Sequence, residues 1–175
     1  RVPQGTRRRA SFAFRRTREG VLLGFNGRAS HRIADLLECP LLVPALTAAL
    51  PALRQGLVTL FPDPVQGDLA VLATEAGLDV LIVCEAPLDL FRRECLAQLV
   101  HLPGFARFSW QSQSGRETEP VAEARPPQVL LGGLPVVPPP GAFLQPSKEG
   151  EAAIAAQVVS GLSDLEGPLL DLYCG

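Results

Sequence analysis

The sequence predicts an α/β protein in which an α+β central domain, residues 1–140, precedes the beginning of a second domain, residues 141–175. Two observations support this prediction. Segments with the alternation of strands and segments with the spacing of helices follow one another in the order strand, strand, helix, strand. A proline-rich stretch, 134–141, is too stiff for a central strand or a helix and is interpreted as a linker between the domains.

The first element is a predicted β-hairpin with one basic face. In residues 7–16, one face is mostly apolar and the other presents guanidinium groups. The first face carries Arg8, Ala10, Phe12 and Phe14, and the second carries Arg7, Arg9, Ser11 and Arg15. Residues 17–20 can turn the chain into a second strand, whose apolar face carries Val21, Leu23 and Phe25.

Apolar spacing predicts the middle elements. Residues 44–61 carry leucines three and four apart and are expected to form a helix, which Pro51 should kink or split. Residues 68–75 and 78–84 are typical of two strands joined at a tight turn. A second helix follows, and we expect its buried stripe to consist of Leu88, Phe91, Cys95 and Leu99.

After this helix the sequence predicts a strand over 105–110 and a surface loop over 111–119. Beyond the linker, Ser147 is a candidate N-cap for a third helix. One side of that helix is apolar, and a buried strand should follow it over 168–172. The apolar side consists of Ile154, Ala155, Val158, Val159 and Leu162.

Charge is distributed unevenly along the chain. Residues 1–32 contain nine Arg and one Glu, whereas residues 33–175 contain seven basic and seventeen acidic residues, so the formal net charge of −2 conceals a basic N-terminal part. Such polarity favours an anionic partner, and the phosphate backbone of nucleic acid is the commonest extended anion in a cell. A solvated arginine-rich strand pair without a partner is the alternative.

Several classes of protein are disfavoured. The uncharged stretch 39–53 is 15 residues long and contains three prolines, which is too short and interrupted to span a bilayer. No secretory signal is apparent, so we expect a cytoplasmic protein. The four cysteines lack metal-ligand spacing, and Cys84 and Cys95 are expected to pack as small hydrophobes.

Two motifs in the last third of the chain resemble a known family. Residues 141–145 read Gly-Ala-Phe-Leu-Gln, and residues 170–175 read Leu-Asp-Leu-Tyr-Cys-Gly. Together they resemble the F-x-Q segment and the first S-adenosyl-L-methionine (SAM) motif of the RNA uracil-C5 methyltransferases, which modify ribosomal or transfer RNA. The resemblance implies that a Rossmann-like, SAM-dependent domain begins at 141. It also implies that Gln145, Asp171 and Gly175 lie near SAM and that Phe143 lies near the target base.

The N-terminal part is similar to the central domain of the same family. Residues 5–10 resemble its basic, RNA-facing opening strand, so Arg7 and Arg9 are expected to contact phosphates, with RNA and neither DNA nor a membrane as the partner. Residues 38–41 resemble the place where ribosomal-RNA members carry the fourth cysteine of a [4Fe-4S] cluster. Cys39 would be that ligand, with the other three upstream, and the resemblance then favours ribosomal RNA processing. The alternative is a loop cysteine that binds no metal.

The resemblance implies an enzyme that transfers a methyl group from SAM to C5 of a uridine. In the family, a cysteine thiolate adds to uracil C6 and a base later removes the C5 proton, since an unactivated pyrimidine C5 is a poor nucleophile. Both groups lie downstream of residue 175 in the family. We therefore expect no catalytic residue in this chain, a truncated second domain and no activity of the chain alone. The alternatives are a non-catalytic RNA-binding module and a nucleotide-binding metabolic enzyme.

Overall fold

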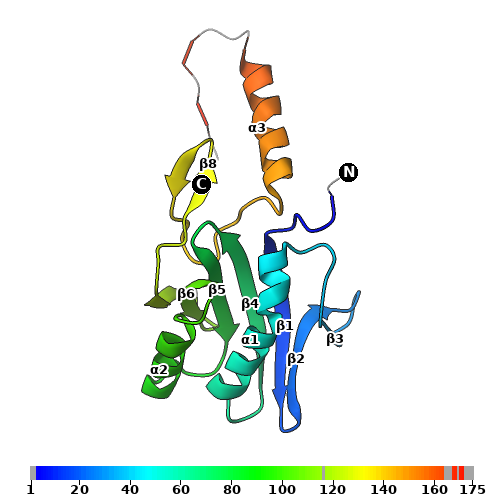
Figure 1. Cartoon of the computed structure of the whole chain (residues 1–175), viewed down its shortest axis with the longest axis vertical. Coiled ribbons are helices and arrows are strands. Elements are labelled where there is room, and N and C mark those ends of the chain that lie inside the picture. The colour runs from blue at the N-terminus through cyan, green and yellow to red at the C-terminus, as the bar shows by residue number, and fades with distance from the viewer. Residues whose placement is uncertain (1–2, 116, 164–166, 169, 172–175) are drawn as a thin grey trace.

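The computed structural model describes residues 3–115, 117–163, 167–168 and 170–171 and confirms the α/β class (Figure 1). The strands of its large sheet are β1 Arg9–Thr17, β2 Gly20–Asn26, β3 Ile33–Asp35, β4 Val65–Thr74, β5 Gly77–Cys84, β6 Phe105–Gln111 and β7 Thr118–Glu123. A separate hairpin pairs β8 Val129–Leu131 with β9 Leu134–Val136. The helices are α1 Pro44–Leu60, α2 Leu90–Leu99 and α3 Lys148–Leu162.

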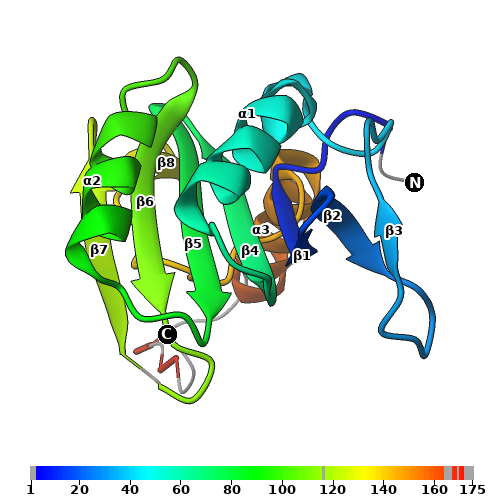
Figure 2. The ribbon, with the colours of Figure 1, turned by 90° about the horizontal axis from the view of Figure 1, so that it is seen from below.

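The large sheet has the strand order β3-β2-β1-β4-β5-β6-β7. Its neighbouring strands are antiparallel except β5 and β6, which are parallel and are joined through α2. Figure 2 shows α1 and α2 covering the same side of the sheet. The two sides of the sheet therefore differ: one packs on helices, and the other is left for the segment that follows β9 and for solvent.

Residue alternation in the predicted hairpin is confirmed. Arg8, Ala10, Phe12 and Phe14 are all buried, whereas Arg7 and Ser11 are exposed and Arg9 and Arg15 are half-buried. The register Thr17↔Gly20 closes the hairpin, and β1 also pairs with β4 along almost its whole length. The basic side of β1 is thus the side that faces away from α1 and α2.

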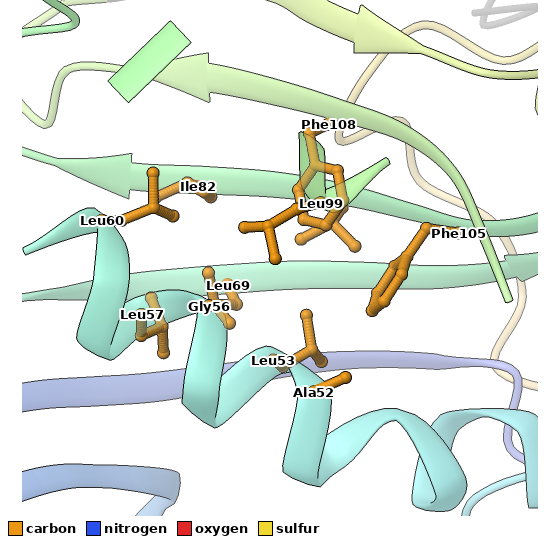
Figure 3. Close-up of a pocket in the computed structure, with 11 residues that line it drawn as sticks. Ala52, Leu53, Gly56, Leu57, Leu60, Leu69, Ile82, Leu99, Phe105 and Phe108 are labelled. Carbon is orange, nitrogen blue, oxygen red and sulfur yellow. The ribbon is translucent and has the colours of Figure 1, made fainter. Parts of the chain in front are cut away.

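The core lies between α1, α2 and the sheet. The leucine stripe of α1 is buried as predicted, at Leu46, Leu50, Leu53, Leu57 and Leu60. Figure 3 shows part of this stripe facing Leu69 and Ile82 of the sheet and Leu99 of α2. The gap that these side chains enclose measures about 10 Å³ and is lined by apolar groups, so it is a packing defect and has no polar partners for water.

The first helix was predicted to be kinked or split at Pro51, and the split does not occur, because α1 continues through Pro51. Pro51 lies on the exposed side of the helix, where its ring does not disturb the core. The prediction that Phe91 belongs to the buried stripe of α2 is also wrong. Phe91 is exposed in the first turn, and Cys95, Leu96 and Val100 are the residues that α2 and its C-terminal end bury.

Two further expectations need correction. The predicted loop 111–119 ends in β7, which pairs with β6, and the predicted linker 134–141 begins with β9. Helix α3 is capped by Ser147 as predicted, but it buries none of its residues. Residues 168, 170 and 171 form no strand, and the other two residues of the predicted strand, Leu169 and Leu172, lie outside the described residues. The domain boundary at 140 stays a prediction.

None of the helices formed by the described residues has the length and apolar character needed to cross a membrane.

Candidate nucleic-acid interface

The opening of β1 is held in place by the loop that contains Cys39. Gly5 donates its backbone N–H to the carbonyl of Pro40 (2.8 Å), and Arg7 donates to Leu41 (2.9 Å). Val43 donates in turn to the carbonyl of Arg7 (3.0 Å). These hydrogen bonds fix the backbone of Arg7 on both sides. Its side chain is exposed, and its Nε donates to the carbonyl of Arg9 (3.0 Å).

Arg9 and Phe143, which were predicted separately as RNA contacts, lie together. The guanidinium carbon of Arg9 sits 4.9 Å from the centre of the Phe143 ring, within the range of a cation–π contact. The ring remains 69% exposed. Because Phe143 meets Arg9 and remains largely exposed to solvent, an aromatic surface is available beside this arginine. Stacking of this kind is how unpaired bases are commonly bound.

Arg8 anchors the segment that contains Phe143. Its backbone N–H donates to the carbonyl of Pro146 (2.7 Å), and its Nε donates to the carbonyl of Gln145 (3.2 Å). Its Nη2 forms an ion pair with Glu151 in the first turn of α3. The Arg8 side chain is only 3% exposed, so its contacts are shielded from solvent. Sequence alternation placed Arg8 on the buried side of β1, but nothing local to β1 signalled these distant partners.

A second buried arginine holds the segment before Phe143 against the basic side of the sheet. Arg107 of β6 donates through Nε and Nη2 to the carboxylate of Asp79 on β5 (2.9 and 2.7 Å) and through Nη2 to the carbonyl of Pro138 (2.9 Å). Asp79 and Arg107 are each only 4% exposed. Gly141 follows with φ +73°, and a Cβ there would lie 2.7 Å from a methyl carbon of Leu81. Glycine thus permits both the turn and the close approach.

Arginines without acidic partners are concentrated at the N-terminal part of the molecule. Among the described residues 3–32, only Arg8 forms an ion pair; Arg7, Arg9, Arg15, Arg16, Arg18, Arg28 and Arg32 form none. The one acid on the same side of the neighbouring strand is Asp68, which pairs in register with Ala13. Burial raises the pKa of Asp68, which makes its negative charge less favourable than that of a solvated carboxylate.

The predicted cofactor residues are only partly described. Gln145 is half-buried, and within the described structure its side-chain amide has no hydrogen-bond partner, so the amide is available to a ligand. Asp171 is exposed, and Gly175 lies outside the described residues. The assignment of Gln145, Asp171 and Gly175 to SAM therefore stays a prediction.

Cys39 is half-buried and free. Within the described residues, no three His, Cys, Asp or Glu side chains gather in a way that could hold a metal ion. One thiolate cannot hold an iron–sulfur cluster. The role of Cys39 as a cluster ligand likewise stays a prediction.

Comparisons with known proteins yield a consistent set of relatives. No protein-family model matches the chain. It is 41% identical over 170 residues to a protein of Brucella suis biovar 1 that is named an uncharacterized RNA methyltransferase. The match covers 97% of this chain and 39% of the relative. It is 29% identical over 176 residues to the 23S rRNA (uracil(1939)-C(5))-methyltransferase RlmD of Enterobacter sp. strain 638, covering 99% of this chain and 40% of the relative. The chain spans about two fifths of the length of these relatives.

One solved structure is similar in fold. It is the crystal structure of the Pyrococcus abyssi tRNA (uracil-54, C5)-methyltransferase in complex with S-adenosyl-L-homocysteine, with a TM-score of 0.62. The match covers 95% of this chain and 43% of the other, at 14% sequence identity. At that identity the likeness concerns the fold alone.

Proposed function

We propose, from the premise that the chain belongs to the RNA methyltransferase family, that it supplies the RNA-facing surface of a SAM-dependent enzyme that methylates C5 of a uridine. The family resemblance seen in the F-x-Q segment and the acid–glycine motif is confirmed by the curated relatives. The activity and the target are our proposal, since the chain spans only about two fifths of those relatives.

The observation that supports the proposal best is the contact between Arg9 and Phe143. It joins the basic strand, which suits phosphates, to the F-x-Q segment, which the resemblance places beside the target base. Arg7 extends the positive charge next to an exposed aromatic ring. Phosphate contacts of this kind supply affinity and position, whereas stacking on Phe143 would hold an unpaired base.

SAM would supply the methyl group, and Gln145 is the described residue that fits it. The free side-chain amide of Gln145 can both donate and accept a hydrogen bond, while its backbone carbonyl is fixed by Arg8. Asp171 and Gly175 would complete the site, as the resemblance implies. The position of Gln145 two residues after Phe143 lets one short segment serve the cofactor and the base together.

Ribosomal RNA is the target we favour over transfer RNA, and this preference rests on Cys39. If Cys39 is the fourth ligand of a [4Fe-4S] cluster, the whole protein belongs with the ribosomal-RNA members. A non-catalytic RNA-binding module remains the second candidate, because the basic surface and Phe143 alone would suffice to bind RNA.

The test is methyl transfer from labelled SAM to unmodified ribosomal and transfer RNA by the full-length protein, purified without oxygen. We expect the label on C5 of a uridine in ribosomal RNA and no transfer by the 175-residue chain alone. Label in transfer RNA would overturn the choice of RNA class. RNA binding without transfer by the full-length protein would favour the non-catalytic module.

A further inference from the structure

The basic surface continues well beyond the residues assigned above. Outside residues 3–32, each described basic side chain except Arg125 is paired with a carboxylate: Arg54 with Asp35, Arg92 with Asp89, Arg93 with Glu119, Arg107 with Asp79 and Lys148 with Glu75. The arginines of the first two strands and their loops are left without such partners. Unpaired charge concentrated on one part of a surface is the pattern expected for a polyanion site.

Two of these arginines, Arg15 and Arg18, lie at the opposite end of β1 from Phe143, and two more lie in a loop that the side chain of Arg15 contacts. Arg15 lies on the same side of the strand as Arg9, and Arg18 follows in the hairpin turn. Arg28 and Arg32 lie in the loop between β2 and β3. We call Arg15, Arg18, Arg28 and Arg32 the distal patch.

Hydrogen bonds hold the loop between β2 and β3 beside Arg15. The backbone N–H of Gly27 donates to the carbonyl of Arg32 (2.9 Å) and closes the loop. The backbone N–H of Arg32 donates in turn to the hydroxyl oxygen of Ser30 (3.1 Å). Arg15 Nη2 donates to the carbonyl of His31 (3.4 Å). The side chains of Arg18, Arg28 and Arg32 are exposed and have no ion-pair partner among the described residues.

A groove of about 630 Å³ opens at this end of the sheet, between the hairpin turn and the start of β4. Arg15 and Arg18 line it together with Pro64 and Gln66, and Glu19 is the single acid in the lining. Between the groove and Arg9, β1 presents only the short side chains Ser11 and Ala13 on this side. Arg15 follows Arg9 by six positions along the strand, a distance of about 20 Å.

We propose that the distal patch binds the phosphates of the RNA strand that flanks the target nucleotide, so that the RNA runs along β1 from Phe143 to the groove. A single nucleotide cannot reach across about 20 Å, so only a continuous strand can contact both ends. This inference rests on the proposed function, because it assumes that Phe143 and Arg9 mark where RNA binds.

The test measures the salt dependence of binding of the full-length protein to a single-stranded oligouridine longer than about 16 nucleotides. One variant carries Arg15→Ala and Arg18→Ala, a second carries Arg7→Ala and Arg9→Ala, and a third combines all four. Arg125→Ala is the matched control, since Arg125 is also exposed and unpaired. Arg28→Ala with Arg32→Ala repeats the test on the loop, in case the hairpin substitutions disturb folding.

Each lost phosphate contact should reduce the slope of log affinity against log salt by roughly 0.7, so each double variant should lose about 1.4 and the quadruple variant about twice as much. Binding should stay at one RNA per protein. If both distal variants match Arg125→Ala while Arg7→Ala with Arg9→Ala still lowers the slope, the distal patch is not part of the path. If neither end changes the slope, the proposed function itself fails.

Discussion

Arg7, Arg8 and Arg9 are three consecutive arginines in different environments. Arg7 is exposed, Arg9 lies against an aromatic ring, and Arg8 is buried with the carbonyls of Gln145 and Pro146 and the carboxylate of Glu151 as partners. Two of the three thus face outward, and the middle one ties their strand to the F-x-Q segment. Burial is what makes Arg8 important, because a buried charge with its partners removed is costly.

Replacing Arg8 by Met should lower the free energy of unfolding by about 2 kcal/mol, since it removes hydrogen bonds to Gln145 and a partly buried carboxylate. Arg7→Met is the matched control and should change the unfolding free energy little, because Arg7 is exposed. Urea unfolding followed by circular dichroism measures both. Equal midpoints for the two variants would show that the contacts of Arg8 add nothing to stability.

Cys84 makes the chain sensitive to alkaline pH. Burial raises the pKa of its thiol from 9.0 to about 11, so the thiol stays protonated in the folded chain over a range where it ionises in the unfolded chain. This contribution to stability is complete below about pH 9 and is lost as the pH rises towards about 11. Unfolding midpoints should therefore fall over this range by more in the wild type than in Cys84→Ala. Identical pH profiles would contradict this account.

At the scale of elements, β4 needs a glycine at position 67, where it pairs with β1 on one side and β5 on the other. A Cβ on Gly67 would lie 2.3 Å from the carbonyl oxygen of Val83 and 2.9 Å from the ring of Phe14. The obstacle includes backbone, so it cannot move aside as a flexible side chain would. Gly161 in α3 offers the opposite case, because a Cβ there meets nothing within 4 Å.

Gly67→Ala should therefore destabilise the chain by roughly 1–3 kcal/mol through overpacking. Gly161→Ala should leave stability unchanged or raise it slightly, because alanine is the better helix former. Thermal unfolding of the two variants provides the comparison. A Gly67→Ala variant that unfolds at the wild-type temperature would mean that β4 and β5 are not packed as described.

The elements that could be predicted from sequence are those whose own pattern determines their environment. The alternation in β1 and the leucine spacing in α1 predicted the buried residues of both correctly. Strand β7 was missed because its sequence is largely polar and contains Pro120, and its pairing with β6 is a tertiary contact. The apolar side of α3 could be predicted from sequence, but such a stripe indicates only which side would pack against a neighbour, and none of α3 is buried in the described structure.

The candidate site follows the same division. Arg7, Arg9 and Phe143 could be proposed from the basic strand and the family resemblance. Their juxtaposition could not, because it depends on Arg8 and Arg107, whose partners lie far away in the sequence. Tertiary contacts of this range leave no trace in local periodicity.

At the scale of the whole molecule, the two sides of the large sheet differ. Helices α1 and α2 cover one side (Figure 2), while the other carries Arg9 and Arg15 of β1, Phe143 and the segment that leads to α3. Charge follows the same separation, since the basic side chains elsewhere in the described structure are, apart from Arg125, neutralised by carboxylates. The central claim is that RNA binds on the side of the sheet that the helices leave open.

Photo-crosslinking of RNA containing 5-iodouridine to the full-length protein, followed by mass spectrometry of the joined peptides, tests that claim most directly. The account predicts crosslinks to Phe143 and to peptides of β1, and their loss in Arg7→Ala with Arg9→Ala. Crosslinks confined to α1 and α2, with none on Phe143 or β1, would contradict it.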